Sequence, residues 1–309
     1  MRQEKEKSPG TNGAEKLRHH HRSKLVDCPQ LDFKAALDAA GFPTKTPIIP
    51  DGKLHRFHIE GDKPGNKNGW YVLYGDGLPS GAFGSWKTGF KGTWCEKTQH
   101  TFSQAERDQF RQRMAVAQKA RDLEELTRWA EARNKASSIW KTALPVPQDY
   151  PYLVRKNIGN HGLRLYKTSL VIPMRDSTGN LHSLQFIDGE GNKRFLSGGR
   201  KKGCYFAIGK LADSLCIAEG YATAASIYEA TGIATAVAFD AGNLEAVALA
   251  LRAKFQKIEI TLCADNDAGT PGNPGLTKAR EAAAACGALL AVPPIAGDFN
   301  DLIQQGFQS

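Results

Sequence analysis

The last third of the chain, from Ser214 to Gly306, alternates short apolar runs with Ala-rich segments of helical length. Apolar runs this short predict buried strands, and the longer segments between them predict helices. The expected strands are Leu215–Ala218, Thr235–Phe239, Ile258–Cys263 and Ala288–Val292, and the expected helices are Ala222–Thr231, Leu244–Lys254 and Leu276–Cys286. This alternation predicts an α/β fold, in which right-handed crossovers join a parallel four-stranded sheet with helices on both faces.

Acidic residues follow these apolar runs. Glu219 comes directly after the first run, and Asp265 and Asp267 come after the third. Asp298 and Asp301 lie at the start of the last short helical pattern. Because ligands bind at the carboxyl ends of the strands in open parallel sheets, we expect these carboxylates to meet at one edge of the sheet.

Carboxylates gathered at one edge repel one another unless a cation offsets their charge. Oxygen ligands without a neighbouring His or Cys favour magnesium or manganese over zinc. Such an ion takes further ligands from water and phosphate, so the pattern indicates phosphoryl transfer or phosphodiester cleavage. Any one of these acids alone is more simply explained as a helix cap. Three acids at equivalent positions favour the metal site.

Glu-Gly after one strand, Asp-x-Asp-x-Gly after a later strand and a trailing acidic piece resemble a TOPRIM domain, the catalytic module of bacterial primases, type IA and II topoisomerases and some nucleases. The segments AEGYATAASI, AFDAGNL, CADNDAGTPGNPG and GDFNDL are most similar to primases of conjugative plasmids, integrative elements and phages. The resemblance implies that Glu219, Asp265 and Asp267 are catalytic and bind metal, joined by Asp298 and Asp301. Replicative primases tend to have a Lys where this chain has Gly297.

Other residues of the same edge are predicted to support the site. Gly220 completes the Glu-Gly pair, and Asp240 follows the second expected strand and extends the acidic edge. Asn243 is expected to cap the next helix. The sequence leaves Glu219 open between two roles, metal ligand and general base.

The charge balance indicates a polyanionic partner. The 309 residues include 41 Lys and Arg against 32 Asp and Glu, a net charge of +9, and a basic surface attracts nucleic acid. Residues 1–27, with the run His19–His21, are expected to form a disordered basic tail.

We expect no membrane partner, because no apolar run approaches the roughly 20 residues of a spanning helix. The N-terminal MRQEKEKSPG lacks the apolar core of a signal peptide, so a cytoplasmic location is expected. The six cysteines are Cys28, Cys95, Cys204, Cys216, Cys263 and Cys286. They form no C-x-x-C pair, so no zinc is expected.

Residues 28–100 are expected to form a small β-rich domain that binds nucleic acid. A short helix, Leu31–Gly41 with its start at Asp32, precedes segments that alternate apolar and polar residues between glycines, a pattern typical of short antiparallel strands. The domain resembles the zinc ribbon of plasmid and phage primases without its Cys ligands. Among its aromatic residues, Trp86 and Phe90 are the best candidates for exposed base-stacking side chains. The alternative is that these rings belong to the core.

Residues 101–145 are predicted to be a long charged helix linking two domains, beginning at the capping-box sequence SQAE. Prolines end the helix before a small mixed subdomain at 146–212, in which three strands are joined by turns at Ser177–Gly179 and Gly189–Gly191. Residues 213–309 form the predicted TOPRIM catalytic domain.

The subdomain at 146–212 resembles the basic subdomain that precedes TOPRIM in bacterial primases. That resemblance implies that Arg175, Lys193 and Arg194 line the channel for template and nucleotide. Lys201 and Lys202 belong to the same cluster of cations, which is too dense to be explained by solubility alone.

Together these features predict a DNA primase that synthesises short RNA primers on single-stranded DNA by metal-dependent nucleotidyl transfer, for a mobile element. The expected partners are a single-stranded DNA template and ribonucleoside triphosphates. A replicative helicase is a further candidate, since no Walker motif occurs in the sequence. Two alternatives stay open: a TOPRIM nuclease that cleaves DNA or RNA phosphodiesters, and a non-catalytic single-stranded-DNA-binding accessory of replication.

Overall fold

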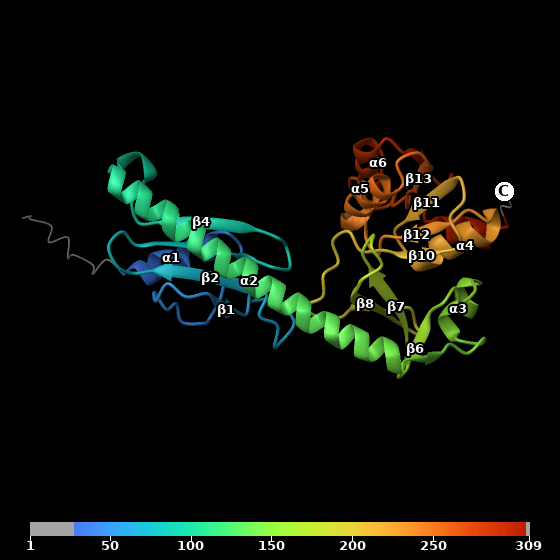
Figure 1. Ribbon diagram of the computed structural model, residues 1–309, viewed down its shortest axis with the longest axis horizontal. Helices are drawn as coiled ribbons and strands as arrows, with labels where there is room; N and C mark the ends of the chain where they lie inside the picture. Colours follow the sequence, from blue (N-terminus) through green and yellow to red (C-terminus); the bar gives the residue numbers. More distant parts are fainter. Residues whose placement is uncertain (1–27, 307–309) are drawn as a thin grey trace, which may run out of the picture. The chain divides into compact units, whose positions relative to one another are not determined.

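The structure, a computed structural model, describes residues 28–306 (Figure 1). The basic tail expected at residues 1–27 lies outside the described residues. The chain forms two compact units, one ending at Asp122 and the other beginning at Leu123. This boundary falls inside the long helix α2 (Gln104–Thr142), so each unit contains part of that helix. The finer division into five segments stays a prediction.

The first unit contains an antiparallel sheet with the strand order β1-β2-β3-β4, as the alternating pattern predicted. Its elements are α1 (Pro29–Ala39), β1 (His55–Phe57), β2 (Gly69–Tyr74), β3 (Ser80–Ser85), β4 (Lys91–Cys95) and a 3₁₀ turn at Gln99–Thr101. The helix begins at Pro29, three residues before the predicted start at Asp32, because proline is preorganised for the first helical position. Phe33 of α1 packs its ring against Tyr71 and Phe83 of the sheet.

Helix α2 begins with the predicted capping box. The Ser103 backbone N–H donates to Glu106 Oε2 at 2.8 Å, and the Glu106 N–H donates to Ser103 Oγ at 3.3 Å. In the second unit, Ala136 and Ile139 of this helix are buried in a cluster with Val171 and Leu184. None of the helices among the described residues has the length and apolarity needed to cross a membrane.

The second unit opens with a five-stranded antiparallel sheet in the order β5-β6-β7-β8-β9. Its elements are β5 (Leu144–Pro145), α3 (Pro151–Lys156), β6 (Arg164–Tyr166), β7 (Ser169–Arg175), β8 (Leu181–Asp188) and β9 (Lys193–Phe195). The two predicted turns join β7 to β8 and β8 to β9. Gly179 and Gly191 each occupy the left-handed region there, with φ of +91°, which explains the glycines.

The C-terminal sheet has five strands in the order β10-β12-β11-β13-β14. Its elements are β10 (Phe206–Ile208), β11 (Ser214–Ala218), α4 (Tyr221–Thr231), β12 (Thr235–Val237), a 3₁₀ turn (Ala241–Asn243), α5 (Leu244–Lys254), β13 (Glu259–Cys263), α6 (Pro274–Cys286), β14 (Leu289–Ala291) and α7 (Phe299–Gln304). The four predicted strands pair in parallel, which confirms the predicted α/β class. Strand β10 was not predicted and pairs antiparallel with β12.

The helices of this sheet lie on both of its faces (Figure 1). Val247 and Leu251 of α5 are buried with Ala279 and Ala282 of α6 on one face. On the other face, Tyr221 of α4 belongs to a core that also includes residues of α3, β7 and β11, so one continuous core joins the antiparallel sheet to the C-terminal sheet. This shared core holds α3 beside the carboxyl end of β11.

The side chain of Asn243 links the segment before β10 to the end of β12. Although it holds the N-cap position of α5, its side chain makes no capping bond, contrary to the sequence prediction. Instead its Oδ1 accepts from the Gly203 N–H at 2.8 Å, and its Nδ2 donates to the carbonyls of Cys204 and Ala238 at 3.0 and 2.8 Å. The side chain is 2% exposed, so no water can replace these bonds readily.

We predict that Asn243→Ala lowers the free energy of unfolding by about 1 to 3 kcal/mol, because it leaves buried backbone groups without partners. Urea denaturation followed by circular dichroism measures the change. Gln256→Ala, at an exposed position next to the same helix, is the control and should leave the transition midpoint unchanged. An unaltered midpoint for Asn243→Ala would contradict this role.

Candidate active site

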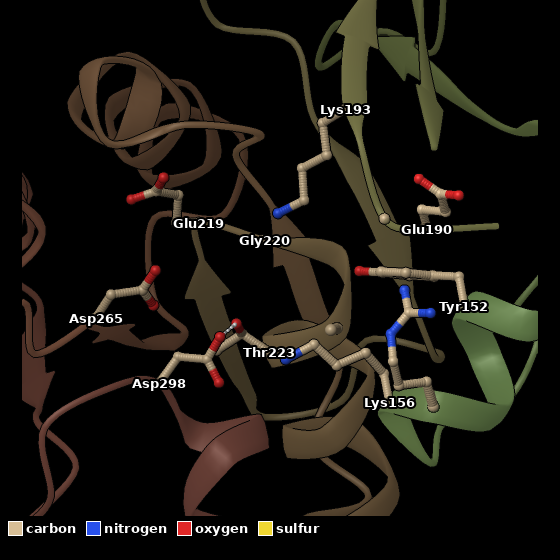
Figure 2. A pocket seen from close by; sticks show the side chains of 12 residues that line it. Tyr152, Lys156, Glu190, Lys193, Glu219, Gly220, Thr223, Asp265 and Asp298 are labelled. Atoms are coloured by element: carbon tan, nitrogen blue, oxygen red, sulfur yellow. Dashed lines mark hydrogen bonds between the residues drawn. The ribbon is translucent and has the colours of Figure 1, made fainter. Parts of the chain in front are cut away.

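Three predicted metal-binding carboxylates line one pocket of about 270 Å³ in the second unit. Glu219 follows β11, Asp265 follows β13, and Asp298 precedes α7. Figure 2 shows these three side chains along one wall, with Tyr152 and Glu190 on the opposite side and Lys156 extending from α3 toward Asp298. The carboxyl ends of parallel strands therefore bring together residues that are far apart in sequence.

Glu219 is held by its backbone at the point where β11 ends. Its carbonyl accepts from the Phe239 N–H at 2.8 Å, which extends the pairing of β11 with β12 by one step. Burial raises the pKa of the Glu219 carboxyl, and the negative charges of Asp240 and Asp267 raise it further. The positive charge of Lys193 lowers the pKa of Glu219. Ionised Glu219 is thus in a site that disfavours its charge.

Asp265 is the most perturbed acid of the pocket. Burial, followed by the charges of Glu219, Asp298 and Asp267, raises its pKa to about 7. Within the described part of the chain, its Oδ1 atom is buried and has no hydrogen-bond partner. A buried carboxylate oxygen without a donor is costly, and a cation bound at this oxygen would remove that cost.

Asp298 combines a structural role with its place in the pocket. Its Oδ1 accepts from the Asp301 N–H at 2.9 Å, and Asp301 Oδ2 accepts from the Asp298 N–H at 3.2 Å, which forms a capping box for α7. Asp298 Oδ2 accepts from Thr223 Oγ1 of α4 at 3.0 Å (Figure 2). Both oxygens are therefore oriented before any ligand binds.

The backbone conformation before Asp298 favours glycine. Gly297 has φ of +120°, and a Cβ there would lie 2.7 Å from Asp301 Oδ2. The left-handed backbone therefore disfavours a lysine at position 297, and the Asp301 carboxylate would have to move to admit its Cβ.

Two of the five predicted metal residues, Asp267 and Asp301, do not line the pocket. Asp267 Oδ2 accepts from the Gly275 N–H at 3.1 Å at the start of α6. Asp301 forms the capping box and an ion pair with Lys156 at 3.4 Å. Asp267 is still close enough for its charge to raise the pKa of both Glu219 and Asp265.

The cations of the pocket come from β9 and α3. Lys193 was predicted, and Figure 2 shows its ammonium group directed toward the carboxylates. Arg155 and Lys156 at the end of α3 also line the pocket, with Tyr152, whose pKa burial raises to about 12. Helix α3 was not predicted, and Arg155 and Lys156 were missed as site residues; the basic pair that follows Pro151 is the sequence signal that could have indicated them. Gly220 and Thr223 complete the lining at the start of α4.

The other predicted cations lie outside the pocket lining. Arg194 places its guanidinium 4.5 Å from the ring centre of Phe186, and Arg175 Nη1 donates to the Gly179 carbonyl at 2.9 Å. Lys201 pairs with Asp240, the predicted extension of the acidic edge, while Lys202 is exposed. Their predicted contacts with nucleic acid stay predictions.

Trp86 and Phe90 belong to the first unit. Phe90 is 42% exposed, and its ring centre lies 5.0 Å from that of Phe42. Trp86 is half-buried beneath the Arg56 guanidinium, 5.4 Å from its ring centre. Their predicted stacking with bases likewise stays a prediction.

The pocket fits a hard divalent cation, although residues 28–306 contain no group of three His, Cys, Asp or Glu side chains arranged as a ready ligand set. Magnesium characteristically binds through one or two carboxylates and keeps waters or phosphates as its other ligands. The buried Oδ1 of Asp265 and the raised pKa values of Glu219 and Asp265 are what such an ion would relieve. The donors are oxygens alone, which suits magnesium or manganese.

Comparison with known proteins agrees with this geometry. Residues 214–308 match the model of the Toprim domain, so the C-terminal region is a Toprim domain. The chain is homologous to the plasmid-type DNA primase TraC: two Escherichia coli proteins of that name are 38% identical over 88% of this chain and 35% identical over 86% of it. The chain spans 27% and 19% of the lengths of these two relatives.

Solved primase structures are also similar to this chain. The primase fragment of the bacteriophage T7 primase-helicase protein is 17% identical and matches 53% of this chain and 76% of its own, with a TM-score of 0.38. The DnaG primase catalytic domain bound to single-stranded DNA is 12% identical, matches 60% of this chain and 79% of its own, and has a TM-score of 0.38.

We predict that Asp265→Asn stabilises the metal-free protein, and more so at high pH. The folded-state pKa of about 7 lies above the ordinary aspartate value of 3.8, so the native state binds more protons than the unfolded state between these two pH values. Stability therefore falls as pH rises through this window. At roughly 1.4 kcal/mol per pKa unit, Asp265→Asn raises the free energy of unfolding at pH 8 by at most about 4 kcal/mol.

Thermal unfolding in EDTA at pH 4 and pH 8 measures this difference. The variant should resemble the unmodified protein at pH 4 and unfold at a higher temperature at pH 8. Asp213→Asn, at an exposed position before β11, is the matched control. A gain that does not depend on pH would show that Asp265 is not held in a charge-disfavouring site.

Proposed function

We propose that this chain carries the catalytic activity of a DNA primase, a DNA-directed RNA polymerase that makes short RNA primers on single-stranded DNA for a mobile element. The observation that carries the proposal is the pocket in which half-buried carboxylates of a Toprim domain face Lys193, Arg155 and Lys156. Homology to the TraC primases over most of the chain supports it.

The reaction joins two ribonucleotides. The 3′ oxygen of one nucleotide forms a bond to the α-phosphorus of the next, the bond to the β-phosphate breaks, pyrophosphate leaves, and the hydroxyl proton is released. Glu219 and Asp265 would hold Mg²⁺ or Mn²⁺, with Asp298 and the nearby Asp267 and Asp301 contributing negative charge. When bound, the metal supplies charge neutralisation at the phosphates and lowers the pKa of the attacking hydroxyl.

Glu219 has a second possible role as general base. Its raised pKa makes proton uptake near neutral pH easier than for an ordinary glutamate. Its position at the end of β11 serves both the metal-ligand role and the general-base role.

Lys193, Lys156 and Arg155 form the basic wall of the pocket, and this wall binds the phosphates of the nucleotide. Lys193 approaches from β9 and Lys156 from α3, so their ammonium groups reach the pocket from elements outside the acidic edge (Figure 2). They supply the pocket with positive charge that position 297 lacks. Arg155 adds a planar guanidinium that can bind two phosphate oxygens at once.

The proposed partners follow from this reaction. They are a single-stranded DNA template, ribonucleoside triphosphates and, as a further proposal, a replicative helicase that supplies unwound template. Arg175, Arg194, Lys201 and Lys202 are proposed to attract the DNA strand through its phosphates.

We predict that the protein incorporates labelled ribonucleotides on random single-stranded DNA when Mg²⁺ is present and not when EDTA removes it. Glu219→Gln and Asp265→Asn should each lower the rate by at least about 100-fold, since electrostatic stabilisation of this kind typically supplies that factor. Asp213→Asn is the control and should keep its rate.

Two other outcomes would contradict the proposal. Nicking of supercoiled plasmid without incorporation would identify a nuclease. DNA binding that is unaffected by Asp265→Asn, with no incorporation by the unmodified protein, would identify a non-catalytic accessory.

We predict that Lys193→Ala and Lys156→Ala each lower kcat/KM for ribonucleoside triphosphates by about 10- to 100-fold, because each removes a charge-assisted phosphate contact worth about 1.5 to 3 kcal/mol. Steady-state primer synthesis measures this. Lys257→Ala removes an exposed lysine before β13 and serves as the control. Equal loss in all three variants would show that overall charge, and not the pocket wall, is responsible.

A further inference from the structure

Phe195 is a large apolar side chain beside the pocket that the mechanism above does not use. It ends β9, the edge strand of the antiparallel sheet, and is 39% exposed. The hydrophobic clusters of the described residues do not include it. A single exposed phenylalanine is ordinary on a protein surface, so only its surroundings can give it a function.

Phe195 and Lys193 project from the same face of β9. Side chains two residues apart on a strand share a face, with their Cα atoms about 6.6 Å apart. Arg194, between them, contacts Phe186 on the other face, its opposite residue in the register of β8 with β9. Because Lys193 lines the acidic pocket, Phe195 lies on the side of the strand that faces it.

The ring of Phe195 is supported by the Toprim domain. It meets Phe239 edge to face, with ring centres 6.4 Å apart and planes at 80°. Phe239 follows β12 and has φ of +76°, a conformation that costs energy for a residue other than glycine. The same residue donates its N–H to the Glu219 carbonyl, so the ring pair is tied to the backbone of the proposed catalytic glutamate.

A cation flanks the ring. Lys201 Nζ lies 5.1 Å from the ring centre of Phe195 while it pairs with Asp240. Lys201 therefore flanks the exposed ring, and Lys193 precedes Phe195 by two residues on the same face of β9. Aromatic rings among cations that track phosphates are how proteins bind single-stranded nucleic acids without reading their sequence.

We propose that Phe195, supported by Phe239, is the surface on which a nucleobase of the substrate stacks. This inference rests on the proposed function, because it takes the phosphate of that nucleotide or of its neighbour to be in the acidic pocket. The base belongs either to the template strand or to the incoming nucleotide, and both present the same flat ring to Phe195.

The test compares binding by Phe195→Leu and Phe195→Trp with binding by a matched control. Phe255→Leu is that control, since Lys254 Nζ lies 5.2 Å from its ring centre in the same kind of pair, outside the residues that line the pocket. Ligands are a fluorescent single-stranded DNA, the same strand with abasic sites, ATP, and inorganic triphosphate. Thermal unfolding checks that each variant is folded.

Phe195→Leu should weaken binding of intact DNA, of ATP, or of both by about 5- to 100-fold, since stacking contributes about 1 to 3 kcal/mol per base. Binding of abasic DNA and of triphosphate should not change, and Phe195→Trp should bind like the unmodified protein. A loss confined to DNA assigns the base to the template, and a loss confined to ATP assigns it to the incoming nucleotide.

Equal losses for intact and abasic ligands, no loss for either DNA or ATP, or an equal loss in Phe255→Leu would each overturn the inference. Failure of the proposed function gives a different result. In that case the unmodified protein makes no primers, whereas the dependence of binding on Phe195 and on the presence of a base would persist.

Discussion

Electrostatic repulsion among half-buried carboxylates is the constraint on which the pocket of the second unit depends. The sheet brings Glu219 and Asp265 to one edge, where burial and mutual repulsion raise the pKa of each. No helix cap or salt bridge neutralises Asp265 Oδ1 within the described residues. The fold holds these acids together at an energetic cost that a bound divalent cation would offset.

The cations and the acids of the pocket come from different parts of the second unit. Lys193 belongs to the antiparallel sheet and Lys156 to α3, whereas Glu219 and Asp265 follow strands of the C-terminal sheet. One core, with Tyr152, Met174 and Tyr221 among its members, joins α3 and β7 to the Toprim domain. Buried Asn300 strengthens this junction, because its Nδ2 donates to the Lys156 carbonyl and to Ser226 Oγ, each at 2.8 Å. The positions of Lys156 and Lys193 relative to the acids are therefore set by side-chain packing and not by a flexible linker.

Much of this architecture could be predicted from the sequence, because strand and helix periods are local signals. The parallel pairing of β11 to β14 and the location of Glu219 and Asp265 at the carboxyl ends of these strands were predicted, whereas the order of the strands was not. Strand β10 could not be predicted, because three residues are too few to show an alternating pattern. The strand is defined by its pairing with β12. Lys156 was missed for a similar reason: only the tertiary core brings α3 to the pocket. Asp267 and Asp301 were predicted as metal residues from their motifs, but they do not line the pocket. Nearby backbone N–H groups donate to one oxygen of each side chain, and the sequence motif does not reveal these local bonds.

The turn before α7 limits which residues position 297 can take. Gly297 is compatible with the fold because its missing side chain leaves space for the Asp301 carboxylate. A lysine at position 297 would strain the backbone at φ of +120° and would push the Asp301 carboxylate out of the capping box of α7. In this chain the positive charge beside the acids instead comes from α3 and β9.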